Sequence, residues 1–317
     1  MSYILKLYHY SYLTRSIDQK IIHEYPNQQI RCPVHLSLGQ EGIASGVSLA
    51  IKKDDMVMSN HRSHAHYLAK GSSIQNFVNE IYGKKNSSSG GKGGSMHLID
   101  LKNNFYGSTP IVGSTLPVAT GLAFSNKIQN IKDRIVVVYF GDGAFETGNF
   151  HECLNFASLK NLKILFVCEN NLYSVYSGLN VRQNKNIKIF KTAKNYNINS
   201  SQMMGHCPDL IYNKIKMIRK KMINNSRPYL IEFLTYRTVE HCGTNNDDNL
   251  GYRSKKQIQY WKNKCPIIYL RSKYKNLNKK FDKIEKNLDN KVNKIFNKAK
   301  KEKYPNKDRL SKNIYAK

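Results

Sequence analysis

Two short apolar runs joined by one helical segment constrain the fold of this chain more than any other feature. The first run, Arg134 to Phe140, is rich in Val, Tyr and Phe, which suits a strand buried on both faces of a parallel sheet. It stops at residues 141–143, Gly-Asp-Gly, where we expect a tight turn made of residues that lack a Cβ. A helix with Glu146 in its first turn should follow, and a second run, Lys163 to Cys168, ends in Glu-Asn-Asn at residues 169–171. The pattern predicts a strand, a helix and a parallel strand.

Each predicted strand is followed by a side chain that carries oxygen. The carboxyl ends of parallel strands share one edge of a sheet, and open α/β sheets bind ligands there, so Asp142 and Asn171 should meet. Carboxylate and amide oxygens suit Mg²⁺, which is usually completed by phosphate and water. The sequence therefore predicts a magnesium diphosphate site. The alternative is that Gly-Asp-Gly is an ordinary surface turn and Asn-Asn an ordinary loop boundary.

Gly-Asp-Gly, 26 intervening residues and Asn-Asn form a spacing that is similar to the thiamine diphosphate signature. The surrounding sequence resembles the α subunit of the decarboxylating component of 2-oxo acid dehydrogenase complexes, of the pyruvate dehydrogenase type, over nearly the whole chain. The resemblance implies a thiamine diphosphate-binding α/β fold, with a parallel sheet flanked by helices. It also implies that Asp142, Asn171 and the backbone carbonyl of Tyr173 hold Mg²⁺, and that Gly143 and Ala144 approach the diphosphate by backbone.

Residues 61–66 read His-Arg-Ser-His-Ala-His, and three histidines so close together are a candidate zinc site. No Cys or acidic residue completes such a site, and an arginine among imidazoles suits a diphosphate better, because a guanidinium offers paired donors to phosphate. In the resembled family a Tyr-Arg-x-His pattern occupies this place, so His61 departs from the usual tyrosine. The resemblance implies that His61 and Arg62 contact the cofactor, and that His64 and the upstream His35 face the reacting end.

Two further positions come from the resemblance alone. It places the backbone at Val112 against the aminopyrimidine ring of the cofactor and leaves Ile111 as a packing residue. It gives His241 a contact with the diphosphate and a possible part in stabilising developing charge. In several relatives a serine that is phosphorylated follows this histidine, whereas Cys242 follows it here, so we expect no regulation of that kind.

Basic residues outnumber acidic ones throughout the chain, with 51 Lys and Arg against 22 Asp and Glu and a formal charge of +29. The basic residues are dispersed rather than blocked, which is typical of solvated faces, and no nucleic-acid-binding motif accompanies them. We therefore expect no nucleic-acid partner. The alternative from another class is a non-catalytic protein that binds through its basic surface.

The six cysteines stand singly, without a Cys-x-x-Cys pair, which favours reduced thiols in a cytosol-like compartment. The amino terminus lacks the apolar core of a signal peptide, and no apolar run approaches the length of a membrane span. We expect a cytoplasmic protein with no membrane partner.

We expect one domain over residues 1–317, in which residues 270–317 form a basic carboxyl-terminal helix and tail. The Gly- and Ser-rich residues 86–95 read as a linker by composition, but the resemblance implies an ordered loop inside the domain. The polar residues 244–251 have little to bury, so we expect a mobile loop over the site.

The function implied by the resemblance is oxidative decarboxylation of a 2-oxo acid, pyruvate first, with transfer of the acyl group to a lipoyl group. The resembled α subunits work in α2β2 heterotetramers whose β subunit supplies the glutamate that activates the cofactor. The implied partners are therefore a β subunit and a lipoyl-bearing acyltransferase. An acetoin dehydrogenase, or another accessory thiamine diphosphate enzyme, is the alternative within the same class.

Overall fold

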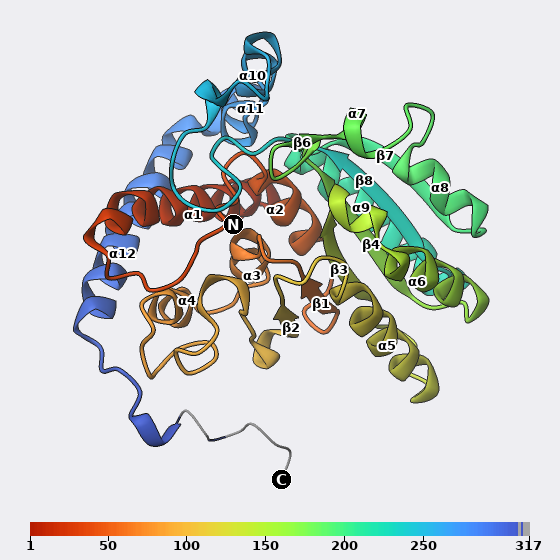
Figure 1. Cartoon of the computed structure of the whole chain (residues 1–317), viewed down its shortest axis with the longest axis horizontal. Coiled ribbons are helices and arrows are strands. Elements are labelled where there is room, and N and C mark those ends of the chain that lie inside the picture. Colours follow the sequence, from red (N-terminus) through yellow and green to blue (C-terminus); the bar gives the residue numbers. More distant parts are fainter. Residues whose placement is uncertain (310–311, 313–317) are drawn as a thin grey trace.

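The computed structural model describes residues 1–309 and 312 of the chain. At its centre lies a six-stranded sheet in the order β2-β1-β3-β4-β8-β7, in which every pair of neighbours is parallel (Figure 1). The strands are β1 Met56–Ser59, β2 Phe105–Ser108, β3 Val136–Gly141, β4 Ile164–Asn170, β7 Asn199–Met204 and β8 Tyr229–Leu234. The predicted α/β class with a parallel sheet is confirmed.

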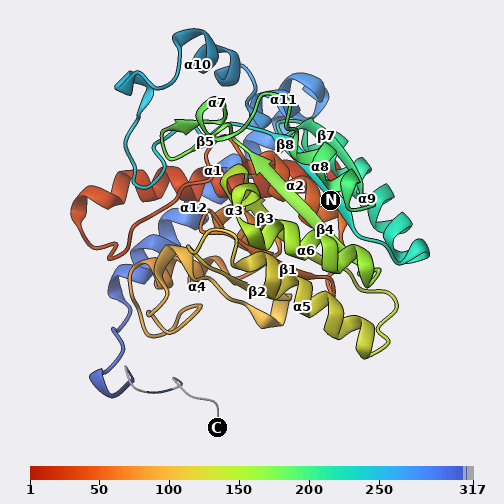
Figure 2. The ribbon, with the colours of Figure 1, turned by 45° about the vertical axis from the view of Figure 1, so that its right-hand side comes forward.

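Helices cover both faces of this sheet (Figure 2). One face packs against α1 Tyr3–Glu24, α2 Glu41–Ala50, α3 His64–Ala69, α4 Ile74–Ile81, α9 Pro208–Asn225, α11 Pro266–Lys273 and α12 Asn278–Lys301. The other face packs against α5 Thr115–Ile128, α6 Gly148–Leu159 and α8 Ile189–Asn195. The short elements β5 Tyr173–Ser174, β6 Ser177–Gly178, α7 Leu179–Arg182 and α10 Lys255–Lys262 lie beyond the carboxyl ends of the strands.

The central strands are apolar on both faces because both faces are covered. Along β3, Val137 and Tyr139 enter the core on the α1 side, while Val136, Val138 and Phe140 enter the core on the α5 side. Side chains of a strand alternate between the two faces of its sheet, so a strand covered on both sides needs a continuous apolar run. The strand could therefore be predicted from its apolar run in the sequence.

The first helix of the chain and the last long one lie side by side, since α12 runs along α1 on the outside of the molecule (Figure 1). The apolar side of α12 is buried, and its Phe281 stacks on Tyr8 of α1 with ring centroids 3.9 Å apart. Burial of one such ring stabilises the fold by roughly 1.5–3 kcal/mol. Most lysines of α12 face solvent, as expected for a solvated basic face.

The segment after β3 differs from its prediction. Residues Asp142–Glu146 form a 3₁₀ helix, η4, rather than a tight glycine turn, and neither Gly141 nor Gly143 has a positive φ. Glu146 ends η4 and does not lie in the first turn of α6. Conformational freedom is therefore not why glycine stands at 143; a Cβ there would lie 3.1 Å from Ser174 Oγ, so the position needs a small residue.

The Gly- and Ser-rich loop is ordered by one buried carboxylate. Glu80 of α4 accepts hydrogen bonds from the backbone N–H groups of Ser89, Gly91, Gly93 and Gly94, at 2.7–3.2 Å. The loop therefore belongs to the domain, as the resemblance implied.

We expected the polar loop at 244–251 to bury few side chains, and this prediction is wrong for one residue. Asp247 is buried between the guanidinium groups of Arg237 and Arg253 and also accepts a hydrogen bond from the Tyr252 hydroxyl. Within the described part of the chain, no helix is long and apolar enough to cross a membrane. The end of the predicted tail, residues 310–311 and 313–317, lies outside the described residues.

Candidate functional site

Four strands end at one edge of the sheet and leave a cavity of about 180 Å³ there. Gly141 of β3 pairs with Glu169 of β4, so the residues that follow these strands, Asp142 and Asn171, reach the same cavity as predicted. All predicted site residues except His64 line this cavity. They are His35, His61, Arg62, Val112, Asp142, Gly143, Ala144, Asn171, Tyr173 and His241.

Asp142 opens η4, and its side chain is buried at the floor of the cavity. Its carboxylate forms an ion pair with Arg182, the last residue of α7, whose guanidinium also pairs with Glu146. Burial raises the pKa of the Asp142 carboxyl, and the Arg182 guanidinium offsets part of that rise. Arg182 is thus the cation that lies beside this carboxylate in the cavity floor.

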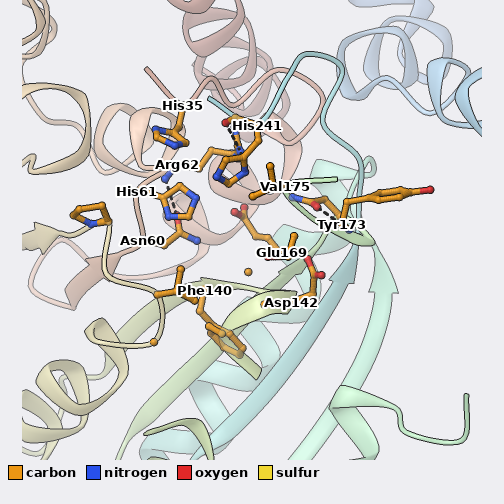
Figure 3. A pocket seen from close by; sticks show the side chains of 18 of the residues that line it. His35, Asn60, His61, Arg62, Phe140, Asp142, Glu169, Tyr173, Val175 and His241 are labelled. Carbon is orange, nitrogen blue, oxygen red and sulfur yellow. Dashed lines mark hydrogen bonds between the residues drawn. The ribbon is translucent and has the colours of Figure 1, made fainter. Parts of the chain in front are cut away.

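The backbone after β4 is bent toward the cavity. Asn171 Nδ2 donates to Gln40 Oε1 at 3.2 Å, and its Oδ1 accepts from the Tyr173 backbone N–H at 3.2 Å. Leu172, between them, has a φ of 74°, a conformation that costs free energy for a residue with a side chain. The Tyr173 ring points away, with its hydroxyl donating to Gln257 at 2.6 Å, so Tyr173 lies along the cavity with its side chain turned outward (Figure 3).

Arg62 lies at the opposite end of the cavity from Asp142 (Figure 3). Its Nη1 donates to the Leu36 carbonyl at 2.7 Å and its Nη2 to the His241 carbonyl at 3.0 Å. Among the residues that the structure describes, no carboxylate lies within ion-pair distance of this guanidinium, although its residue is 4% exposed. Burial, followed by repulsion from Arg237, lowers its pKa to about 10. A buried cation without a counter-ion is a ready site for an anion.

Three imidazoles surround Arg62. The ring centroids of His35, His61 and His241 lie 4.7–5.3 Å from one another in edge-to-face arrangements (Figure 3). Burial and the charge of Arg62 lower their pKa values to about 2, 3 and 4 respectively. All three rings are therefore neutral near pH 7.

The other two histidines of residues 61–66 are turned away from the cavity. His64 is fully buried, its Nδ1 donating to Asp18 at 2.8 Å and its Nε2 accepting from Ser95 at 2.6 Å. His66 Nε2 donates to Glu169 at 3.0 Å, and its ring stacks on Tyr139. The zinc alternative at residues 61–66 therefore lacks a common geometry, and the structure does not bring His64 to the reacting end.

Comparison with known proteins shows the family to which the chain belongs. A model of the family described as "Dehydrogenase E1 component" matches residues 8–308. The chain belongs to the dehydrogenase E1 component family. Membership of this family implies the use of thiamine diphosphate, in agreement with the spacing from Asp142 to Asn171.

Several relatives of this E1 chain are named pyruvate dehydrogenase E1 component subunit alpha. That of Rickettsia prowazekii is 34% identical over 259 residues, which is 82% of this chain and 78% of the relative. A chloroplastic alpha-3 subunit of Arabidopsis thaliana is 31% identical over 326 residues, which is 98% of this chain and 74% of the relative. A mitochondrial subunit of Schizosaccharomyces pombe is 33% identical, over 81% of this chain and 61% of the relative.

Arg182, which lies beside the cavity, and Gln40 and Glu169, which line it, were not predicted as site residues of this E1 chain. Arg182 follows no motif and reaches Asp142 only because the β5-β6 hairpin folds back over η4. Gln40 and Glu169 lie in segments for which the sequence predicted a helix start and a strand end, and no role in the site was predicted for either residue. Both point inward, Gln40 toward Asn171 and Glu169 toward His66. A buried Glu at a strand end was the one signal that the sequence offered.

Proposed function

We propose that this chain is the α subunit of a pyruvate dehydrogenase E1 component. Its reaction is the oxidative decarboxylation of pyruvate, with transfer of the acetyl group to a lipoyl group. The single observation that carries the proposal is the cavity with Asp142 and Asn171 at one end and, at the other, the buried Arg62, which has no carboxylate partner in the described part of the chain. The relatives named as pyruvate dehydrogenase α subunits support the choice of substrate.

The two ends of the cavity fit a magnesium diphosphate group. The Asp142 carboxylate, the Asn171 amide oxygen and the Tyr173 carbonyl are hard oxygen donors suited to Mg²⁺. The guanidinium of Arg62 and the imidazoles of His61 and His241 would hold the diphosphate. Two small residues, Gly143 and Ala144, allow its oxygens to approach the backbone of η4, and Val112 on the cavity rim would lie against the aminopyrimidine ring.

Thiamine diphosphate, when bound, supplies the electron sink for the carbanion that decarboxylation leaves. The residues of this chain would bind the diphosphate and neutralise its charge. Arg62 would offset the charge of the diphosphate, and its burial would strengthen that interaction. His35 and His241 are neutral, so each can accept a hydrogen bond at one ring nitrogen and donate one from the other.

A β subunit would complete this site. Two apolar residues on the cavity rim, Ile111 and Val112, are 69% and 50% exposed, and Val118 of α5 is 53% exposed. The Glu169 carboxylate in the cavity already accepts from His66 and Gln40, so it is not free to activate a cofactor. We propose an α2β2 heterotetramer whose β subunit supplies the activating glutamate, and a lipoyl-bearing acyltransferase as the acyl acceptor.

We also propose that residues 1–309 form one domain, because α12, near the carboxyl end of the chain, packs against α1 near its amino end. For the cellular location we propose the cytoplasm. The Arabidopsis and S. pombe relatives are named chloroplastic and mitochondrial, so an organelle is the alternative that cell fractionation decides.

The test is a titration of thiamine diphosphate and Mg²⁺ into the purified chain, with and without its β subunit. The single tryptophan, Trp261, stacks on Tyr236 near the segment that leads to His241, so its fluorescence reports on the site. Saturable, magnesium-dependent binding that is lost in Asp142→Ala supports the cofactor site. Turnover of pyruvate by the αβ complex, without turnover of acetoin or branched 2-oxo acids, supports pyruvate as the substrate. Turnover by the lone α chain, or no binding with the β subunit present, would refute the proposal.

A further inference from the structure

Three histidines from distant parts of the chain form a compact group, which we call the histidine cluster. His35 precedes α2, His61 follows β1, and His241 follows β8. One ring nitrogen from each lies within 4.8 Å of the corresponding nitrogens of the other two. His35 is held in place by a backbone bridge to Gly243, and its segment carries the carbonyl that fixes Arg62. The cluster is therefore assembled by the fold and not by sequence proximity.

The cluster is chemically prepared to bind a soft or borderline cation. Burial and the nearby Arg62 charge keep all three imidazoles neutral, and the neutral imidazole is the form that ligates metals. Within the described residues, His35 Nδ1 is buried and has no hydrogen-bond partner, and His35 is only 6% exposed. A buried ring nitrogen without a partner costs free energy, which a ligand would recover.

We propose that the histidine cluster binds one transition-metal ion, such as Zn²⁺, through three imidazole nitrogens. Tetrahedral Zn²⁺ with Zn–N bonds near 2.0–2.1 Å places its ligand nitrogens roughly 3.3 Å apart. The observed limit of 4.8 Å therefore has to close by about 1.5 Å, which rotation of the partly exposed His61 and His241 side chains can provide. The fourth position faces the cavity, as in zinc sites with three protein ligands.

Arg62 affects both the metal affinity of this site and the identity of its fourth ligand. Its guanidinium opposes a second cation, and its Nη2 lies 3.4 Å from His241 Nδ1, so the metal should bind less tightly than in a structural zinc site. The same guanidinium favours an anion beside the metal, so the fourth ligand should be hydroxide or a carboxylate. The site is distinct from the oxygen ligands around Asp142, which suit Mg²⁺ and lie across the cavity (Figure 3). It shares His61 and His241 with the proposed diphosphate site, so the transition metal and thiamine diphosphate should compete for these two residues.

The experiment is a Co²⁺ titration of the purified full chain without thiamine diphosphate, followed by visible absorption. One equivalent of Co²⁺ should give the intense spectrum of a four-coordinate site. The variant His61→Tyr removes one ligand nitrogen but keeps an aromatic ring, and His35→Gln removes another. Each should weaken Co²⁺ binding more than about tenfold. The matched control is His97→Gln, which changes an exposed histidine outside the cluster and should bind Co²⁺ like the unmodified chain.

Two further measurements make the outcome decisive. Acetate added to the cobalt-loaded chain should shift its spectrum, because the fourth position is open to a carboxylate. The exposed Cys242, next to His241, is tested by Cys242→Ser, which should leave the spectrum unchanged. Equal Co²⁺ affinity in His61→Tyr with native circular dichroism, a weak six-coordinate spectrum, or loss of the spectrum in Cys242→Ser would each overturn the proposal. The titration contains no cofactor, so its failure is separate from failure of the proposed function.

Discussion

Replacement of Asp247 by Asn should destabilise the chain far more than the same change at its neighbour, Asp248. Asp247 is 2% exposed and lies between Arg237 and Arg253, whose side chains are 1% exposed. Asn keeps the shape of Asp but leaves the buried Arg237 without a carboxylate partner among the described residues, and leaves Arg253 only its longer contact with Asp248, at 3.8 Å. Loss of one partner from a buried ion pair typically costs about 3–5 kcal/mol. Asp248 pairs with Lys262, which is 52% exposed, and lies at the longer distance of 3.8 Å from Arg253, so Asp248→Asn should cost only about 1 kcal/mol.

The assay is urea unfolding followed by far-ultraviolet circular dichroism, with free energies taken from the midpoint and the slope. A second variant tests the cause: Arg253→Met in the Asp247→Asn background should recover part of the lost stability, because it removes one orphaned cation. Equal midpoints for Asp247→Asn and Asp248→Asn would refute the reasoning. A double variant less stable than Asp247→Asn alone would show that Arg253 acts through its packing on Tyr236 and Tyr252, over whose rings it lies at 4.7 Å.

Three further predictions concern the site and its support. Arg182→Gln removes the cation that pairs with Asp142, so Mg²⁺-dependent binding of thiamine diphosphate should need about tenfold less Mg²⁺ in a fluorescence titration; a higher requirement would mean that Arg182 assists the ligand. The histidine cluster has folded pKa values below the unfolded value, so the unfolded state binds more protons and the free energy of unfolding should fall as pH drops below about 6.5, by up to about 1.4 kcal/mol per histidine and pH unit. This loss should be smaller in His61→Tyr when urea midpoints at pH 7 and pH 5 are compared. Glu80→Gln weakens four backbone hydrogen bonds, so limited proteolysis should cut residues 86–95 faster than in an Asn76→Asp control, which changes an exposed side chain of the same helix.

The sheet and the meeting of Asp142 with Asn171 were predictable because both follow from local pattern. A strand covered on two faces must be apolar throughout, and parallel strands must end at the same edge. The same reasoning found Arg62 as a candidate for an anion, since a guanidinium among imidazoles is unusual in any local context.

The errors arose where a residue's role depends on segments far along the chain. His64 and His61 are neighbours in sequence, but His64 begins α3 and turns toward Asp18 of α1, which no local pattern reveals. Asp247 stands in a run that reads as solvent-exposed, and only the positions of Arg237 and Arg253 make it a buried anion. Tertiary contacts decided these positions against the local expectation.

The charges around the cavity explain why metal and diphosphate should bind together. At one end the Asp142 carboxylate is held by Arg182, and at the other Arg62 has no carboxylate partner among the described residues. A metal alone would have to replace Arg182 and would still leave Arg62 without an anion. A diphosphate alone would satisfy Arg62 but would meet the negative charge of Asp142. The pair satisfies both ends at once, so each should raise the affinity for the other by the same factor, as linkage requires. Arg182, freed from Asp142, then keeps Glu146 as its partner, so its release does not leave a charge unpaired.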